Sequence, residues 1–218
     1  MIKLLIYDLD GTLIDSGQDI ASSVNWMLQE LNFKKLSVEQ ISSHVGEGVA
    51  HLMKSVLTLS GAHPDEKLVE QAAKIYRGRY ANHLLDQTKL YPSVARVLEH
   101  FKSRKQAVIT NKPEGFSQEI LRGLKVDSYF FRIIGGDQTF QKKPSPEAVF
   151  ELMRLVSVGL EETVFIGDSQ IDIQTGKNAG IHTVGVTYGF KDTNHIKEAK
   201  PDFVMHNLSE LVSCPILV

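Results

Sequence analysis

The sequence predicts an α/β fold, in which a parallel sheet covered by helices on both faces is interrupted after its first strand by an all-helical insert. Beyond Pro92, short apolar runs alternate with helical patterns, and this alternation is typical of parallel strands joined by crossover helices. Before Pro92, one apolar run stands at the start and helical periodicity follows it. The 218 residues leave room for one large domain or two small ones.

The first apolar run, residues 3–7, ends in acidic residues and therefore indicates a buried strand rather than a signal peptide. Five more runs predict strands at residues 106–110, 131–135, 163–167, 183–187 and 202–205. Helical patterns predict the connecting helices at residues 93–103, 115–124, 146–156 and 171–179. The α/β core is expected to comprise residues 1–15 and 89–218.

The insert, residues 16–88, is expected to be a separate helical domain. Ile20, Val24 and Met27 recur at three- and four-residue spacing, and Asp15 or Ser16 is placed to cap the start of this helix. Further helices are predicted at residues 49–59 and 66–85.

Charge and composition exclude several classes of partner. With 24 Lys+Arg against 26 Asp+Glu, the chain lacks the basic surplus of a nucleic-acid binder. No stretch approaches the roughly 20 apolar residues of a membrane span, so we expect no membrane partner. The single cysteine, Cys214, suits a reducing compartment, and a cytoplasmic location is the expectation. A monomer and a homodimer are both compatible with the sequence.

Polar residues gather where predicted strands end, the edge at which ligands bind in open α/β sheets. The candidates are Asp8 and Asp10, Thr110 and Asn111, Lys143 in a proline-flanked segment, and Asp168 and Asp172. Each cluster taken alone could be an ordinary polar turn or helix cap. Together they would bring several carboxylates to one edge, where mutual repulsion calls for a cation. Mg²⁺ with oxygen ligands is the natural solution, and Thr110 and Lys143 would hold an anion such as phosphate.

These clusters in this order resemble the haloacid dehalogenase superfamily, in its phosphatase branch. The resemblance covers essentially the whole chain and rests on the following segments: Asp8-Leu9-Asp10-Gly11-Thr12-Leu13, Val108-Ile109-Thr110-Asn111, Lys143-Pro144-Ser145-Pro146 and Gly167-Asp168-Ser169-Gln170-Ile171-Asp172. It implies a Rossmann-like core of that superfamily with an inserted helical cap domain.

The resemblance also implies a role for each candidate. Asp8 would be the nucleophile that becomes an aspartyl-phosphate, and Asp10 the general acid and base. Mg²⁺ would be bound by the side chains of Asp8 and Asp168 and by the backbone carbonyl of Asp10, with Asp172 behind them orienting a metal-bound water. The phosphoryl oxygens would be bound by Thr110, Asn111 and Lys143.

Further stretches resemble the bacterial phosphatases of 2-phosphoglycolate within this superfamily. They include residues 45–49, 110–113 and 187–190. The glycine-bearing stretch Gly46-Glu47-Gly48 is the expected substrate-facing loop of the cap, with Glu47 where that group usually has a neutral polar residue. Arg77 and Arg79 are weaker candidates for binding a substrate carboxylate.

The expected activity is therefore Mg²⁺-dependent hydrolysis of a small phosphorylated metabolite, with 2-phosphoglycolate as the leading substrate. The alternatives are a sugar phosphate, pyrophosphate, or a sugar phosphomutase using the same aspartyl-phosphate. Dehalogenation is disfavoured because Asp10 and the pair Asp168 and Asp172 suit a metal, which a dehalogenase does not need. A catalytically silent phosphate-binding module is disfavoured because acids are present at both positions 8 and 10.

Overall fold

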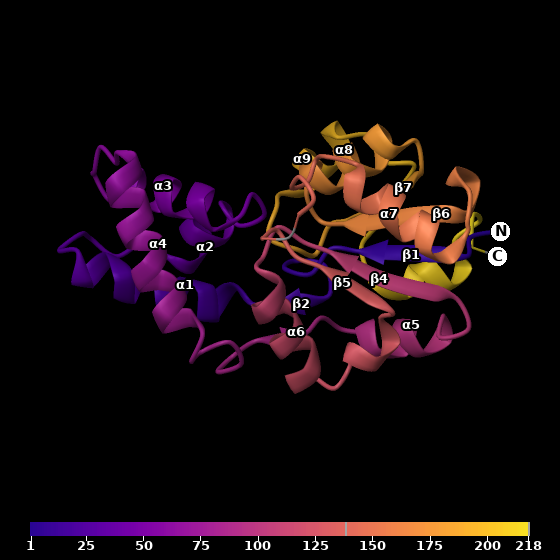
Figure 1. Cartoon of the computed structure of the whole chain (residues 1–218), viewed down its shortest axis with the longest axis horizontal. Coiled ribbons are helices and arrows are strands. Elements are labelled where there is room, and N and C mark those ends of the chain that lie inside the picture. Colours follow the sequence, from indigo (N-terminus) through magenta and orange to yellow (C-terminus); the bar gives the residue numbers. More distant parts are fainter. Residues whose placement is uncertain (138, 218) are drawn as a thin grey trace.

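A six-stranded parallel sheet forms the centre of the protein in a computed structural model, which describes residues 1–137 and 139–217 (Figure 1). The strand order is β5-β4-β1-β6-β7-β8, and all neighbouring pairs are parallel. The strands are β1 (Leu4–Tyr7), β4 (Lys105–Ile109), β5 (Arg132–Ile134), β6 (Thr163–Gly167), β7 (His182–Val186) and β8 (Phe203–Met205).

This order is that of a Rossmann-like sheet. The strand β1 lies in the middle, and the chain builds outward from it first on one side and then on the other. In such sheets the ligand crevice opens beyond the carboxyl ends of the strands where the order reverses. Tyr7 at the end of β1 pairs with Val108 on β4 and Ile166 on β6, so the segments following these three strands emerge side by side.

Helices cover both faces of the sheet because successive side chains of each buried strand point to opposite faces. In β1, Leu5 and Tyr7 belong to one apolar core, and Leu4 and Ile6 to the other. The helices α7 and α8 lie on one face, whereas α5, α6 and η3 lie on the other (Figure 1). The helices of the core are α5 (Val94–His100), α6 (Glu114–Gly123), η1 (Asp127–Tyr129), α7 (Glu147–Val156), η2 (Leu160–Glu162), α8 (Gln170–Ala179), α9 (Thr193–Glu198) and η3 (Leu208–Ser213).

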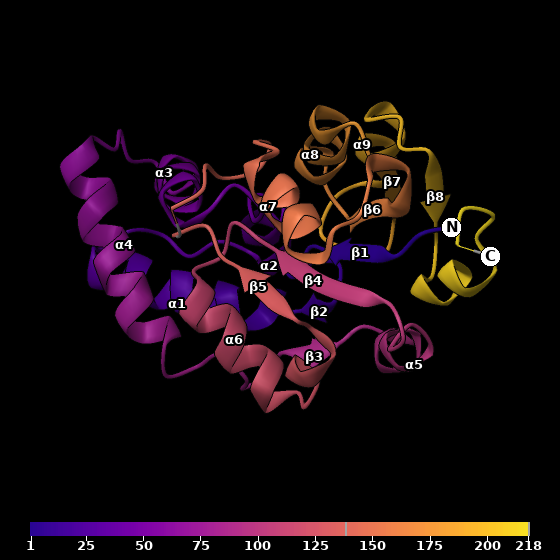
Figure 2. The ribbon, with the colours of Figure 1, turned by 45° about the vertical axis from the view of Figure 1, so that its right-hand side comes forward.

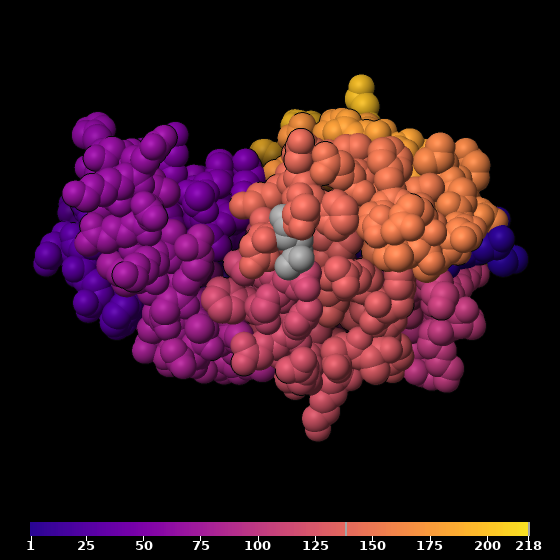
Figure 3. Space-filling view, in the orientation of Figure 1, coloured from indigo at the N-terminus to yellow at the C-terminus, as the bar shows by residue number. Residues whose placement is uncertain are grey.

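The four helices between Gly17 and Tyr80 form a lobe beside the core. Its helices are α1 (Gly17–Glu30), α2 (Val38–Ser42), α3 (Val49–Leu59) and α4 (Glu66–Tyr80). The chain enters and leaves this lobe through an antiparallel ribbon of β2 (Ile14–Asp15) and β3 (Lys89–Leu90). Figure 2 shows the ribbon below the sheet, and the space-filling view in Figure 3 shows the lobe standing out from the core.

The predicted strands are confirmed, each to within one residue at either end. The helix predicted at residues 66–85 is too long, because α4 ends at Tyr80. The physical reason is the buried carboxylate of Asp19 on α1, which accepts hydrogen bonds from the backbone N–H groups of Gln87 and Thr88 and from the Thr88 hydroxyl. The chain has to turn back to make these bonds. The ribbon and the short helices α2 and α9 were not anticipated from the sequence.

The prediction that a side chain caps the start of α1 is wrong. Ser16 occupies the N-cap position, but its side chain makes no capping hydrogen bond. Its hydroxyl instead donates to Asp10 Oδ1 at 2.5 Å. The hydroxyl proton goes to this charged acceptor, whereas the free N–H groups at a helix start could only donate to the serine oxygen.

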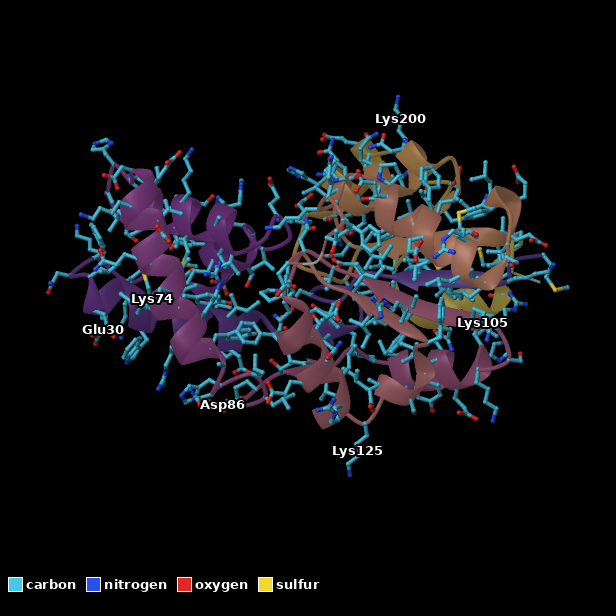
Figure 4. The ribbon with its side chains drawn as sticks, in the orientation of Figure 1. Glu30, Lys74, Asp86, Lys105, Lys125 and Lys200 are labelled. Carbon is cyan, nitrogen blue, oxygen red and sulfur yellow. The ribbon has the colours of Figure 1, made fainter. Side chains whose placement is uncertain are left out.

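Charged side chains of both signs project from the outer surface of both lobes. Figure 4 labels examples: Glu30, Lys74 and Asp86 on the helical lobe, and Lys105, Lys125 and Lys200 on the core. Within the described parts of the chain, none of the helices is both long and apolar enough to cross a membrane.

Candidate active site

The loop after β1 brings Asp8 and Asp10 to the carboxyl edge of the sheet. Asp8 N–H continues the sheet pattern by donating to Ile166 O at 2.9 Å, and both carboxylates are buried. Gly11 turns the chain directly afterwards with a φ of +85°, and a Cβ at this position would collide with the Asp168 carboxylate. Glycine is therefore required there both by its backbone conformation and by the close approach of Asp168.

The segment after β6 contributes two more buried carboxylates. Asp168 Oδ2 accepts the backbone N–H of Phe190 at 2.8 Å. Asp172 lies in the first turn of α8, and its Oδ2 accepts from the backbone N–H and hydroxyl of Ser169 at 3.0 and 2.6 Å. The bond from the Ser169 N–H and the return bond from the Asp172 N–H to Ser169 Oγ at 3.4 Å form a capping box, which holds Asp172 at the positive end of the helix.

Asp8, Asp168 and Asp172 converge, as their spacing predicts. Each offers a carboxylate oxygen, and these oxygens all lie within 4.8 Å of one another. Burial, with Asp172 adding repulsion, raises the pKa of Asp8 to about 7. Burial together with the charges of Asp172 and Asp8 raises the pKa of Asp168 to about 8. The arrangement therefore strongly disfavours full ionisation unless a cation is present.

Lys143 supplies one cation to this cluster. Its ammonium lies 2.7 Å from Asp8 Oδ1 and 2.6 Å from Asp172 Oδ1. Burial disfavours the charged form, but Asp172 and Asp8 outweigh it and raise the pKa of Lys143 above its usual range. The lysine therefore stays charged at neutral pH.

The cluster also fits a divalent metal ion. Asp8 Oδ1 is buried and makes no hydrogen bond within the described residues. The Lys143 ammonium is close enough to form an ion pair with this oxygen, but its angle is not that of a hydrogen bond. Once ionised, three carboxylates facing one lysine carry negative charge in excess. Oxygen ligands with surplus negative charge are the donor set that Mg²⁺ takes. Asp8, Asp168 and Asp172 can therefore contribute to such a site.

Thr110 and Asn111, which follow β4, lie at the same edge but differ in what they contact. Thr110 borders the space next to Asp8, and its hydroxyl accepts the backbone N–H of Lys112 at 3.3 Å. Asn111 Oδ1 accepts the Lys143 backbone N–H at 3.0 Å, and Asn111 Nδ2 donates to Gly46 O at 2.9 Å. The Asn111 amide therefore holds two backbone segments, one carrying Lys143 and the other belonging to the helical lobe.

A cavity of about 40 Å³ lies between the core and the helical lobe, adjacent to the acids. Asp8, Asp10 and Thr110 border it from the core, and Gly46 and Gly48 from the lobe. At roughly 10–15 Å³ per water, it has room for a few waters.

The sequence-predicted loop 46–48 thus reaches the site through its glycines and not through Glu47. The Glu47 carboxylate lies 3.3 Å from His51 Nδ1 and is half exposed. It borders a different cavity, near Lys191. The weaker candidates do not border the cavity at the acids either: Arg79 lies over the ring of Trp26, and Arg77 borders a neighbouring cavity beside Lys142.

The sequence patterns assign no role to Lys112, although it lies in the stretch 110–113. Its ammonium donates to both oxygens of Asp10, at 3.0 and 3.1 Å, and to the Tyr80 hydroxyl at 2.8 Å. The lysine is 8% exposed. The available signal was its place two residues after Thr110 in a turn at the sheet edge, but no spacing rule indicates a partner on the helical lobe.

Comparison with known proteins shows the family of the chain. The model of the family described as haloacid dehalogenase-like hydrolase matches residues 5–186. A phosphoglycolate phosphatase of Pseudomonas putida is 38% identical, over 96% of this chain and 78% of that protein. One of Vibrio parahaemolyticus is 37% identical, over 97% of this chain and 95% of that protein.

A solved structure has nearly the same fold as this chain. The crystal structure of a predicted phosphoglycolate phosphatase from Haemophilus somnus superposes with a TM-score of 0.92 at 29% identity, covering 97% of both chains. Family match, relatives and fold thus agree with one another. The chain belongs to the haloacid dehalogenase-like hydrolase family and groups with its phosphatases.

Proposed function

We propose that the protein is a Mg²⁺-dependent phosphatase that hydrolyses 2-phosphoglycolate to glycolate and phosphate through an aspartyl-phosphate intermediate on Asp8. The observation that carries the proposal is the buried cluster of Asp8, Asp168 and Asp172 with Lys143 between two of its members. Such a cluster costs stability in the absence of a ligand, which is typical of a functional site.

In the first step, a carboxylate oxygen of Asp8 attacks phosphorus and the ester P–O bond breaks. Asp10 gives a proton to the departing glycolate oxygen. In the second step, Asp10 takes a proton from water as this water attacks phosphorus, and the bond between phosphorus and Asp8 breaks. Asp10 is suited to this role because it borders the cavity beside Asp8.

Lys143 and Thr110 are proposed to bind the phosphoryl oxygens. The Lys143 ammonium lies at Asp8, where the transferred group would be held, and Thr110 borders the same cavity. Cationic and hydroxyl donors at this point stabilise the charge that spreads over the phosphoryl oxygens in the transition state. For Asn111 the contacts favour a positioning role, since its amide holds the backbone of Lys143.

Asp8 and Asp168 would hold Mg²⁺ through their side chains and Asp10 through its backbone carbonyl, with Asp172 behind them. When bound, the ion neutralises the excess carboxylate charge and polarises the phosphoryl group. The orphaned oxygen of Asp8 and the raised pKa of Asp168 support this assignment.

Residues 16–88 are proposed to be a cap domain that closes over the site and excludes water. The hydrogen bond from Asn111 to Gly46 O and the position of Gly46 and Gly48 at the cavity support this role. A small cavity at the acids is compatible with a leaving group of a few heavy atoms, such as glycolate. The named activity of the relatives points to the same substrate.

The test is a phosphate-release screen with Mg²⁺ across 2-phosphoglycolate, sugar phosphates, nucleotides and pyrophosphate, repeated with a chelator. We expect a clear preference for 2-phosphoglycolate and complete loss of activity on chelation. A preference for a sugar phosphate would overturn the substrate assignment, and activity that survives chelation would overturn the metal-assisted mechanism.

Two further proposals come from the sequence alone: a cytoplasmic location, and assembly as a monomer or a homodimer. Light scattering coupled to size-exclusion chromatography distinguishes the two assembly states.

A further inference from the structure

We propose that Lys112 is the specificity-determining residue that binds a carboxylate on the leaving group of the substrate. The inference rests on the proposed phosphatase function and deepens it, because it assigns the recognition of the non-phosphate end to one side chain. The observation behind it is a buried ammonium at the junction of the core and the helical lobe, in contact with Asp10 and Tyr80.

Lys112 borders the cavity next to Asp8, and among the described residues around this cavity it is the sole cationic side chain. Much of the remaining wall is apolar or aromatic, with Val45, Leu52 and Phe116 as examples. A carboxylate entering such a cavity loses its hydration and lies near the negative charge of Asp10. It can bind only if a cation compensates for both costs.

The two buried lysines serve different ends of the site. Lys143 contacts Asp8 and Asp172, the residues on the side where the phosphoryl group is proposed to be held. Lys112 contacts Asp10, the residue proposed to face the leaving oxygen. An anionic group attached to that oxygen would therefore meet Lys112 rather than Lys143.

Lys112 can change partners without leaving Asp10 unsupported. An ammonium has three N–H donors, and Lys112 directs them to the two oxygens of Asp10 and to Tyr80. If one donor moves to a substrate carboxylate, the second still reaches Asp10. The Ser16 hydroxyl also donates to Asp10 and keeps its orientation.

Tyr80 offers a second donor from the helical lobe. Its hydroxyl oxygen accepts from Lys112, and in the described structure its own proton has no acceptor. Burial, with added repulsion from Asp10 and Asp19, raises the pKa of Tyr80 well above its usual value, so the phenol keeps this proton. Lys112 from the core and Tyr80 from the helical lobe can thus both donate hydrogen bonds to one carboxylate in the cavity.

A binding experiment with the wild-type protein and Mg²⁺ tests the inference without relying on turnover. The probes are 3-phosphonopropionate, a non-hydrolysable analogue of 2-phosphoglycolate, and propylphosphonate, which has an uncharged methyl group in place of the carboxylate. We expect calorimetry to show at least about 30-fold tighter binding of the carboxylated probe, in line with the cost of losing one partner of a buried charge pair. Equal affinities would overturn the inference.

Variants then identify the group responsible. Lys112→Met keeps most of the length of the side chain but removes the charge, and we expect it to abolish most of the difference between the two probes. Lys112→Arg should retain a preference for the carboxylated probe, and Tyr80→Phe should lose part of it. Lys142→Met, an exposed neighbour outside this cavity, is the matched control and should keep the wild-type ratio. A Lys112→Met protein that keeps the wild-type ratio would overturn the inference.

The same proteins are assayed on 2-phosphoglycolate and 2-hydroxyethyl phosphate, whose leaving group is uncharged. We expect Lys112→Met to lower the ratio of the two kcat/KM values, mainly through a higher KM for 2-phosphoglycolate. An equal fall for both substrates would overturn the inference. If the wild-type enzyme hydrolyses neither substrate, the proposed function fails, whereas the probe affinities still decide the role of Lys112.

Discussion

The ammonium of Lys143 lies 2.7 Å from Asp8 Oδ1, although the two residues come from segments far apart in the chain. The contact brings a permanent cation to the carboxylate that is proposed to attack phosphorus through one of its oxygens. It also offsets part of the repulsion between Asp8 and Asp172, whose other contact with Lys143 is 2.6 Å. The same lysine thus stabilises the buried carboxylates and lies where the phosphoryl group is proposed to bind.

Replacing Asp8 with Asn should abolish turnover, with a fall of at least roughly 10³-fold in kcat, because an amide is a poor nucleophile. The fold should persist, since the substitution removes a buried charge without changing the shape of the side chain. Phosphate release and circular dichroism measure the two effects. Hydrolysis at the wild-type rate would remove Asp8 from the mechanism.

Replacing Lys143 with Ala should destabilise the protein by about 3–5 kcal/mol, because it leaves buried carboxylates without their cation. The kcat/KM value should fall by roughly 10²-fold or more, since a charge donor to the phosphoryl group is lost. Urea unfolding and steady-state kinetics give the two values. The adjacent exposed Lys142→Ala is the control, with a stability change within about 0.5 kcal/mol. If the two variants had equal kcat/KM values, the phosphoryl group would have to bind away from Lys143.

Stability without metal should fall as the pH rises. The carboxyl groups of Asp8 and Asp168 have pKa values of about 7 and about 8 in the folded protein, against 3.8 for a free side chain. The folded state therefore binds protons more tightly, and the stability that this contributes is complete below about pH 4 and lost as the pH passes the folded values.

Thermal unfolding with a chelator, followed from about pH 5 to pH 8, measures this loss. Asp168→Asn is the reference, because it lacks one of the two raised groups, and the wild-type protein should lose stability relative to it as the pH rises. Added Mg²⁺ should stabilise the wild-type protein more at the upper end of the range. A difference between the two proteins that does not change with pH would contradict the prediction.

Replacing Asp19 with Ala should destabilise the protein by about 2–4 kcal/mol, since the donors of Gln87 and Thr88 would lose their acceptor. Thr88→Val removes only the hydroxyl donor and should cost no more than about 1.5 kcal/mol. Urea unfolding compares the two variants. Similar small losses in both would mean that the return segment from the helical lobe is held by other contacts.

The order of the strands along the chain, the helical insert and the acids at the strand ends could be predicted from local sequence. Hydrophobic periodicity decides whether a segment is a strand or a helix, and a strand such as β6, buried on both faces, carries a continuous apolar run. Asp168 and Asp172 could be predicted to share a cavity because they lie four residues apart across the turn from a strand into a helix.

Other features depend on contacts between distant segments. Ser16 carries the local pattern of a helix cap, yet its hydroxyl bonds Asp10, because the loop after β1 folds back onto it. Glu47 lies in the predicted substrate-facing loop, but its carboxylate turns toward His51, one helical turn further along. No pattern within either segment distinguishes these outcomes from the expected ones.

The sequence by itself determined the α/β class, the helical insert, and the set of acids and the lysine at one sheet edge, because these follow from periodicity and from positions relative to strand ends. The tertiary structure alone decided that Lys112 bridges Asp10 and Tyr80 and that Asn111 holds Lys143 and Gly46. The physical reason is that a hydrogen bond depends on distances of about 3 Å between atoms, and these are set only once separate segments have packed together.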